Sequence, residues 1–273
     1  MDERTVGERP DVLGPDQPYE VPEHERLELR QRATRFAVVV PVINEGDRIR
    51  SQLQRMAHQA ELADIIIADG GSTDGSLDPG FLASCGVRAL LVKWGPGHLS
   101  AQLRMAFGYA LEQGYDGVIT VDGNGKDGVE AIDRFIEALD AGFDFVQGSR
   151  FMRGGFHQNT PWSRLVAIRA IHAPVSSWLA RYRYTDTTNG FRGHSARMLA
   201  DPRLAVFREV FDRYELLVYL SVRSARLGFQ VTEIPVSRVY PAAGPTPTKL
   251  HGLAGATELL GVLARMARHR YDP

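Results

Sequence analysis

The sequence predicts an α/β fold, a mixed and mostly parallel sheet flanked by helices in a single domain. Three observations lead to this prediction. Uninterrupted apolar runs, as at residues 36–43, 65–68 and 118–121, are typical of strands that are buried on both faces of a parallel sheet. Segments with apolar residues at helical spacing separate these runs. Each run ends in glycine and polar residues, which is the pattern of βαβ units whose strand ends bind ligands.

Composition excludes several classes of protein. With 273 residues, 44% of them hydrophobic, the chain can form one large domain or two small ones, and one is expected because no linker divides the middle. The net charge of −1 excludes the basic field that holds a nucleic acid. The single cysteine, Cys85, excludes an intramolecular disulfide and a multi-cysteine metal site.

The sequence shows no membrane-spanning segment and no secretory signal. No apolar run approaches the roughly 18 residues that a membrane-spanning helix needs. The first residues are acidic and polar, unlike a secretory signal. We therefore expect a soluble, cytoplasmic protein with at most peripheral membrane contact, as a monomer or a homo-oligomer.

The first half of the chain is expected to alternate strands and helices after an N-terminal arm. Residues 1–34 hold four prolines among many charges, so a disordered or extended arm is expected, with a short helix at residues 24–32. Apolar runs then predict strands, and apolar residues three or four apart predict helices. In order, the expected elements are strand 36–43, helix 49–62, strand 65–68, strand 87–92, helix 99–113 and strand 118–121.

The second half begins with the same alternation and then becomes irregular. A glycine-rich loop at residues 151–159 and a polar loop at residues 186–192 interrupt it, and a proline-rich loop precedes the last helix. In order, the expected elements are helix 129–141, strand 143–148, one or two helices over 162–181, helix 214–227, strand 230–236 and helix 253–269.

Two acidic loops follow the ends of predicted strands. Asp69 and Asp74 come after one strand, and Asp122 and Asp127 come after another. Since the carboxyl ends of parallel strands meet at one edge, the two loops should converge. Carboxylates at such an edge can accept hydrogen bonds from a nucleoside, or hold Mg²⁺ or Mn²⁺ against a diphosphate. The Asp-x-Asn spacing at residues 122–124 is equally compatible with an ordinary turn.

Six motifs, in order, resemble one known family. Residues 38–45, 68–76 and 121–125 resemble the nucleotide-binding half of the family 2 inverting glycosyltransferases, which have the GT-A (Rossmann-like) fold. Residues 147–150, 186–192 and 240–249 resemble the polyprenyl-phosphate sugar transferases (dolichyl-phosphate mannose synthase-like) within that family. The resemblance covers about residues 36–260. It implies a catalytic domain over residues 35–240, followed by a lid loop and C-terminal helix over residues 241–273.

The resemblance implies roles for residues in the first loops. Pro41, Asn44 and Glu45 would border the nucleoside of the donor, and Asp69 would accept hydrogen bonds from the base. Asp122 and the residue two positions on would bind the metal ion and the diphosphate. In this sequence that second position is Asn124 rather than a carboxylate, which lowers the expected metal affinity and gives more weight to Asp127 as a ligand. Lys126 stands where relatives often have glutamine.

Further candidates lie along the rest of the chain. Arg104 matches an arginine of the family's helix after the third strand, and Arg150 stands where a guanidinium could face phosphate, although a solvated arginine is the alternative for each. Lys249 matches the lysine of a loop that closes over the diphosphate in relatives, although an ordinary surface loop would fit the same pattern. Glu215 lies where many family members have a general base, and Asp186 competes for a catalytic role; an ion pair with a nearby arginine is the alternative for both. His98, His157, His194 and His251 are expected beside the site, but their spacing does not make a zinc site.

The last helix has two interpretations. Its apolar stripe of Leu259, Leu260, Leu263 and Met266, next to several arginines, fits either core packing or an anionic membrane surface.

The expected function is inverting transfer of a sugar from a UDP- or GDP-linked donor to a polyprenyl phosphate, assisted by Mg²⁺ or Mn²⁺ at Asp122. One alternative is a soluble transferase that acts on a hydroxyl of a small metabolite or glycan, with Glu215 as general base. A second is a non-catalytic relative that binds nucleotide sugars. A nucleotidyltransferase is disfavoured because the first strand is not followed by a glycine- and lysine-rich loop.

Overall fold

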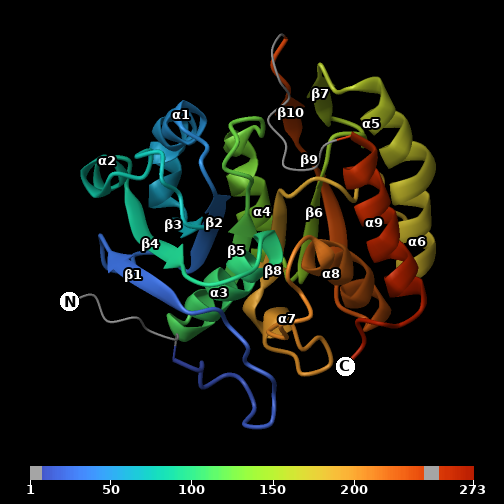
Figure 1. Ribbon diagram of the computed structural model, residues 1–273, viewed down its shortest axis with the longest axis horizontal. Coiled ribbons are helices and arrows are strands. Elements are labelled where there is room, and N and C mark those ends of the chain that lie inside the picture. The colour runs from blue at the N-terminus through green and yellow to red at the C-terminus, as the bar shows by residue number, and fades with distance from the viewer. Residues whose placement is uncertain (1–7, 243–251) are drawn as a thin grey trace.

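An eight-stranded sheet runs through the centre of the protein, which the computed structural model describes for residues 8–242 and 252–273 (Figure 1). The strand order is β1-β4-β3-β2-β5-β8-β6-β9. Strands β4, β3, β2 and β5 are parallel to one another, β8 is antiparallel to both of its neighbours, and β9 is parallel to β6. The predicted mixed, mostly parallel sheet is confirmed. The bounds are β1 His24–Glu28, β2 Phe36–Val42, β3 Asp64–Asp69, β4 Val87–Lys93, β5 Gly117–Thr120, β6 Phe145–Ser149, β8 Arg192–Ser195 and β9 Val231–Pro235.

Helices flank this sheet, and a parallel two-stranded ribbon lies above it in the view of Figure 1. The ribbon consists of β7 Phe156–Gln158 and β10 Ser237–Val239. The helices are α1 Asp47–Met56, α2 Pro79–Ser84, α3 Leu99–Glu112, α4 Ile132–Asp140, α5 Trp162–Ala167, α6 Ala173–Ala180, α7 Ala196–Leu199, α8 Glu215–Arg226 and α9 Gly252–Ala267, with 3-10 turns at Ala57–Glu61 and Val129–Ala131 and a π-helical turn at Ile168–His172.

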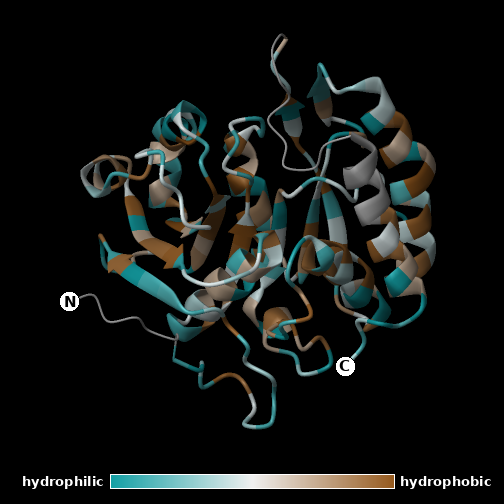
Figure 2. Cartoon of the chain, viewed as in Figure 1, coloured by the Kyte–Doolittle hydropathy of each residue, from teal (hydrophilic) through white to brown (hydrophobic). Residues whose placement is uncertain are grey.

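Alternate residues of the central strands fill two hydrophobic clusters, one on each face of the sheet. In β2, Val38 and Val40 belong to one cluster and Val39 to the other. Residues of α3, α8 and α9 complete the cluster of Val39, and residues of α1 and α4 complete the other. Both faces are therefore covered, which explains why these strands are uninterrupted apolar runs (brown in Figure 2).

The order of the strands fixes the position of the binding edge. From β2 the chain moves outward to β3 and β4, and then returns to β5 on the opposite side of β2. The connections that leave the neighbouring strands β2 and β5 thus diverge, and open α/β sheets bind their ligands at such a point. Asn44 follows β2 and Asp122 follows β5, so the first and last of the predicted donor loops flank this point.

The short helix expected at residues 24–32 is wrong. Residues 24–28 form β1, which pairs with β4 at the edge of the sheet, and these backbone hydrogen bonds outweigh the local preference of the segment. Arg26 of this strand also pairs with Glu112 of α3 at 2.5 Å. Residues 8–23 contain no helix or strand, yet Gln17 donates a hydrogen bond of 3.0 Å to the carbonyl of Ala200. The domain limits at residues 34 and 240 remain a prediction.

Strand β8 was not expected from the sequence. Its residues, Arg-Gly-His-Ser, contain no apolar run, yet β8 lies between β5 and β6 in the middle of the sheet. The Arg192 guanidinium is buried and donates to the carbonyls of Thr187, Asn189 and Leu217. Backbone oxygens thus satisfy a charge that would otherwise exclude this segment from the core. His194, expected beside the site, is also fully buried in β8.

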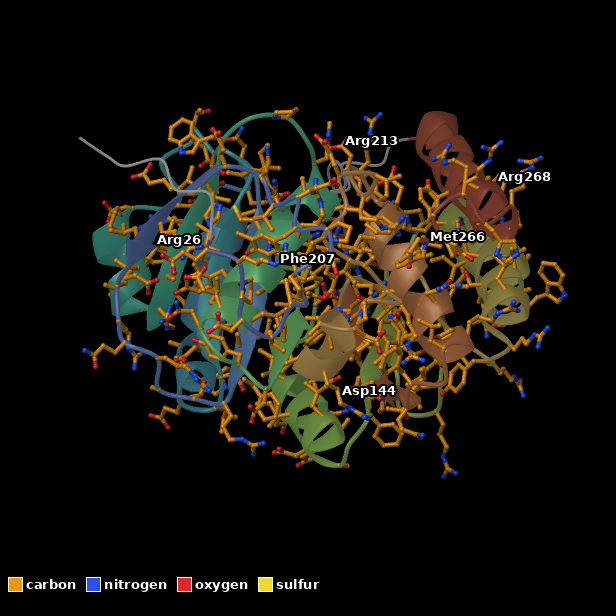
Figure 3. The ribbon with its side chains drawn as sticks, turned by 90° about the horizontal axis from the view of Figure 1, so that it is seen from below. Arg26, Asp144, Phe207, Arg213, Met266 and Arg268 are labelled. Carbon is orange, nitrogen blue, oxygen red and sulfur yellow. The ribbon has the colours of Figure 1, made fainter. Side chains whose placement is uncertain are left out.

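The last helix shows which interpretation of its apolar stripe holds. Leu263 and Met266 are buried in the main core, together with Val262. Figure 3 shows Met266 among side chains of the interior and Arg268 on the outer side of α9. Leu260 is 41% exposed. Leu263 and Met266 of the stripe therefore serve core packing, whereas the side chain of Leu259 lies outside the described part of the chain.

Candidate active site

The loops after β2, β3 and β5 are joined to one another at the carboxyl edge of the sheet. The Asn44 backbone N–H donates to Ser72 Oγ at 2.9 Å, and the Asn44 side-chain oxygen accepts from the Thr73 N–H at 2.8 Å. The Gly123 N–H donates to the carbonyl of Pro41 at 3.3 Å. The structure thus brings the predicted residues Pro41 and Asn44 beside both acidic loops.

Asn44 connects the loops at this edge, because its backbone N–H and its side-chain oxygen both bond to the loop after β3. Its φ of 50° is left-handed, a region that asparagine tolerates better than most residues. Its neighbour Glu45 forms an ion pair of 2.9 Å with Arg48. In the same way, the Asp74 carboxylate accepts from the Gly46 N–H at 2.8 Å. We conclude that these hydrogen bonds fix the loop after β2 against the loop after β3.

Asp69 ends β3 as a buried carboxylate. Its oxygens accept from the Ser72 N–H at 2.9 and 3.0 Å and from the Ser72 hydroxyl at 2.6 Å. Burial raises the pKa of Asp69, and the hydrogen bonds from Ser72 partly offset this rise. Next to it, Gln102 of α3 donates to carbonyls near the ends of β2 and β3, those of Val42 and Ala68, at 2.8 Å each. This glutamine, which the sequence did not reveal as important, fixes the distance between the first two loops.

Arg238 of β10 links the two carboxylates of the third loop. Its guanidinium lies 2.9 Å from Asp122 Oδ2 and 2.6 Å from Asp127 Oδ2. The Asp127 side chain is completely buried, whereas that of Asp122 is 26% exposed. Burial raises the pKa of Asp122, but the positive charges of Arg238 and Lys126 outweigh it, so this pKa lies below its usual range. Asp122 is therefore an ionised carboxylate at the binding edge.

Two glycines make room for this arrangement. A β-carbon on Gly190 would overlap Asp122 Oδ1. A β-carbon on Gly123 would lie 2.9 Å from Val42 Cγ2 and 3.0 Å from the Pro41 carbonyl. The glycine of the 186–192 loop is thus needed because the Asp122 carboxylate fills the space beside it.

Lys126 and Arg164 bring more positive charge to the same place. All three cations lie near the centre of the Tyr240 ring. The Lys126 ammonium is 5.1 Å from it, and the guanidinium carbons of Arg238 and Arg164 are 5.8 and 6.0 Å from it. Arg164 also donates to the Tyr240 hydroxyl at 3.2 Å. Burial, with the positive charge of Arg238, lowers the pKa of Lys126 to about 7. Three cations thus surround one aromatic ring next to two carboxylates.

Arg150 and Asp186 form a buried ion pair with each other. Arg150 Nε lies 2.6 Å from Asp186 Oδ2, and Arg150 Nη2 lies 2.9 Å from Oδ1. Burial raises the pKa of Asp186, but the Arg150 charge more than compensates and leaves it below its usual range. The ion-pair alternative therefore describes what the structure shows for Asp186, and a catalytic role would require this pair to break.

The remaining candidates lie apart from this cluster. Arg104 is buried and donates to the carbonyls of Phe211 and Glu20, so it supports the N-terminal segment instead of the donor loops. Glu215 is the first residue of α8, 8% exposed, and its carboxylate accepts from the Arg213 N–H at 2.6 Å. Lys249 lies outside the described residues.

Arg238 was missed in the sequence. The signal that could have revealed it is a single arginine in the short β-branched segment 236–239. An arginine in a strand of this kind is buried only with an anionic partner, and the two aspartates after β5 are such partners.

Comparisons with known proteins extend the picture. The sequence profile of "Glycosyl transferase family 2" matches residues 37–214, which is more than half of the chain. The chain belongs to glycosyl transferase family 2. This transferase is 28% identical over 206 residues to a polyprenol monophosphomannose synthase of Mycolicibacterium smegmatis, covering 74% of this chain and 77% of that protein. It is also 28% identical over 208 residues to an undecaprenyl-phosphate mannosyltransferase of Micrococcus luteus, covering 75% of this chain and 84% of that protein.

Solved structures support the fold of this family 2 glycosyltransferase. Glucosyl-3-phosphoglycerate synthase of Mycobacterium tuberculosis, in complex with Mn²⁺, UDP-glucose and phosphoglyceric acid, has a TM-score of 0.60 at 16% identity, covering 85% of this chain and 79% of that one. The same enzyme with Mg²⁺ and UDP has a TM-score of 0.59 at 15% identity, covering 85% and 78%. The GT-A fold that the sequence predicts is thereby confirmed.

The residues of this transferase do not fit the divalent cation that its solved relatives bind. Asp122 and Asp127, two of the three predicted ligands, share the Arg238 guanidinium. The third, Asn124, points its amide nitrogen at Asp122 Oδ2 at 3.4 Å, because its oxygen accepts from the Lys126 N–H. Among residues 8–242 and 252–273, no three His, Cys, Asp or Glu side chains are grouped so that they could hold a metal ion.

Proposed function

We propose that this glycosyltransferase moves a sugar from a nucleotide-diphosphate donor, UDP- or GDP-linked, to a polyprenyl phosphate, with inversion at the anomeric carbon. The names of the two bacterial relatives point to this acceptor class. The observation that carries the proposal is the position of α5. Its Arg164 belongs to the cation cluster around Tyr240, and its first residue, Trp162, is 75% exposed.

An exposed apolar stripe extends from this point along α5 and α6. It consists of Trp162, Val166, Ile171 and Trp178, which are 75%, 40%, 38% and 74% exposed. The exposed arginines Arg153, Arg169, Arg181 and Arg183 lie in the same stretch of chain. No helix of the described residues is long and apolar enough to cross a bilayer. Tryptophans next to arginines are suited to the surface of an anionic membrane, where a polyprenyl phosphate resides.

The donor would bind across the ends of β2, β3 and β5. In this proposal Asp69 would accept hydrogen bonds from the nucleoside, and Pro41, Asn44 and Glu45 would border it. The diphosphate would then lie toward the third loop, beside Lys126 and Arg238. Arg150 lines the proposed pocket only through its pair with Asp186, and Lys249 remains a candidate from the sequence.

Transfer in this arrangement needs no general base. An oxygen of the acceptor phosphate is already anionic, so it can attack the anomeric carbon without losing a proton. The bond from that carbon to the diphosphate breaks, and its electron pair stays on the departing oxygen. The protein contributes by holding the two reactants in line and by stabilising the negative charge that develops on the diphosphate.

A transfer assay tests this function. Purified protein is mixed with radiolabelled UDP- and GDP-sugars and a short polyprenyl phosphate in detergent, and the organic phase is counted. We expect label in an acid-labile lipid product with one donor class. Label that appears only in a water-soluble product, whatever the donor, contradicts the proposal.

Glu215→Gln separates the lipid-phosphate acceptor from the hydroxyl acceptor. With a phosphate acceptor we expect turnover within about threefold of the wild type, because no proton has to be removed. A loss of roughly 10²-fold or more would instead indicate a base-dependent hydroxyl acceptor. The thermal stability of the variant serves as the control for folding, because the Glu215 carboxylate accepts the Arg213 N–H.

A further inference from the structure

The charge around the β5 loop is the opposite of what a divalent cation requires. Two carboxylates, Asp122 and Asp127, face three cations, Lys126, Arg164 and Arg238. The immediate surplus is therefore positive. A surplus of this sign attracts a diphosphate and repels Mg²⁺ or Mn²⁺.

From this geometry we propose that Lys126 and Arg238 take the place of the metal ion: they stabilise the departing diphosphate, and transfer proceeds without a divalent cation. The inference rests on the proposed glycosyl transfer and specifies how this chain performs it. Arg238 is the central residue because its guanidinium pairs with both aspartates of the loop, Asp127 and Asp122.

The hydrogen bonds of Arg238 leave it capacity for an anion. Its two terminal nitrogens bind Asp122, Asp127 and Asn189. Its Nε–H is buried and has no acceptor among the described residues. A buried donor without an acceptor costs free energy, and a phosphate oxygen would recover it.

Residues 124 and 126 bring an amide and an ammonium to the β5 loop instead of a second carboxylate near Asp122. Asn124 replaces a carboxylate, and its oxygen is already bound to the Lys126 N–H. The Lys126 side chain is 4% exposed and is held over the Tyr240 ring, so its ammonium has a defined place. An ammonium and a guanidinium at this position place positive charge beside the leaving oxygens and can donate hydrogen bonds to them.

Removal of metal from the wild-type protein is the first test. Binding of UDP and of GDP is measured by calorimetry in EDTA and again with Mn²⁺, and transfer is measured under both conditions. We expect a nucleotide Kd and a turnover in EDTA within about threefold of the values with Mn²⁺. Binding and transfer that are lost in EDTA and return with Mn²⁺ overturn the inference alone. If neither nucleotide binds under either condition, the proposed function itself fails.

Variants of the loop provide the second test. Lys126→Gln should lower turnover by roughly 10²-fold, the effect of losing one charged donor to a transition state. Arg55→Gln is the matched control, because exposed Arg55 donates to the Gly125 carbonyl of the same loop from the opposite side; its turnover should not change. Turnover of Lys126→Gln equal to that of the control overturns the inference.

A double variant tests the reverse change. Asn124→Asp combined with Lys126→Gln adds a carboxylate and removes the ammonium, and it should make UDP or GDP binding at least tenfold tighter with Mn²⁺ than in EDTA. Arg238→Gln is less informative because it leaves Asp127 buried without a partner and risks unfolding. A double variant that folds and binds nucleotide equally with and without Mn²⁺ speaks against the role assigned to these two positions.

Discussion

His194 is a buried histidine that contributes to the acid sensitivity of this protein. It lies between the rings of Phe107 and Phe145, with centroid distances of 5.2 and 5.4 Å. Neither ring nitrogen has a partner among the described residues. Burial lowers the pKa of His194 to about 3, so the folded protein keeps this imidazole neutral while the unfolded chain protonates it near pH 6.5.

This difference predicts a measurable dependence on pH. The unfolded state binds the extra proton, so the free energy of unfolding falls as the pH falls below about 6.5. From pH 7 to pH 5 the contribution of this one residue amounts to about 2 kcal/mol. Urea unfolding at both pH values should show that His194→Leu loses less stability than the wild type by this amount. An equal loss in both proteins would mean that His194 is not the group responsible.

Gly190 provides a second test at the scale of single residues. A methyl group at this position overlaps the Asp122 carboxylate, so Gly190→Ala should displace that carboxylate and weaken nucleotide binding by at least about tenfold, roughly 1.4 kcal/mol. Gly142→Ala is not a matched control, because its φ of 94° adds strain. Gly80→Ala suits better, since its added carbon would meet only one side-chain oxygen, of Asp78, at 3.3 Å. Unchanged nucleotide affinity of Gly190→Ala would contradict the site geometry.

A π-helical turn joins α5 to α6 within the helical segment over residues 162–180. This turn at Ile168–His172 inserts an extra residue into the helix. Val166 and Ile171 are five positions apart and both are exposed. In an uninterrupted α-helix of 3.6 residues per turn, two such residues would point in different directions, whereas a π-helical turn brings them closer to one face. Helices α5 and α6 lie at the right edge of Figure 1, and Trp162, Val166, Ile171 and Trp178 of this segment are all exposed.

Membrane binding tests the role of this stripe. The double variant Trp162→Ala, Trp178→Ala removes two exposed side chains, so folding should be little affected. Its binding to vesicles that contain anionic phospholipid should fall by tenfold or more, because each tryptophan that the membrane buries contributes about 2 kcal/mol to binding. Leu62→Ala with Val12→Ala removes exposed apolar residues elsewhere and is the control. Equal sedimentation of both variants with vesicles would exclude the stripe as the membrane surface.

In the molecule as a whole, the elements predicted correctly are those whose burial produces a local pattern of apolar residues in the sequence. Strands β2, β3 and β5 are covered on both faces, so each is a plain apolar run. Strands β1 and β8 were not expected, because their places depend on long-range partners: the pairing with β4, and the carbonyls that receive Arg192. Contacts of this kind leave no periodicity in the sequence.

The site was predictable to a similar extent. The loops after β2, β3 and β5 converge as strand topology requires, with Asp69 and Asp122 at their ends. The role of Arg238 could not be derived from the sequence, because it comes from a strand 111 positions beyond Asp127. The Arg150–Asp186 pair was foreseen only as an alternative. Local motifs thus indicate where ligands bind, while the charge balance of the site depends on the fold.

Thermal unfolding without metal shows whether the joined loops of β2, β3 and β5 hold a nucleoside diphosphate. Thermal unfolding is followed with UDP or GDP at about 100 times its Kd in EDTA, where binding to the native state contributes about 2.7 kcal/mol. We expect the unfolding temperature of the wild type to rise by roughly 5 °C or more, and that of Asp69→Ala to rise much less. An unfolding temperature that neither nucleotide changes, with or without Mn²⁺, would contradict this expectation.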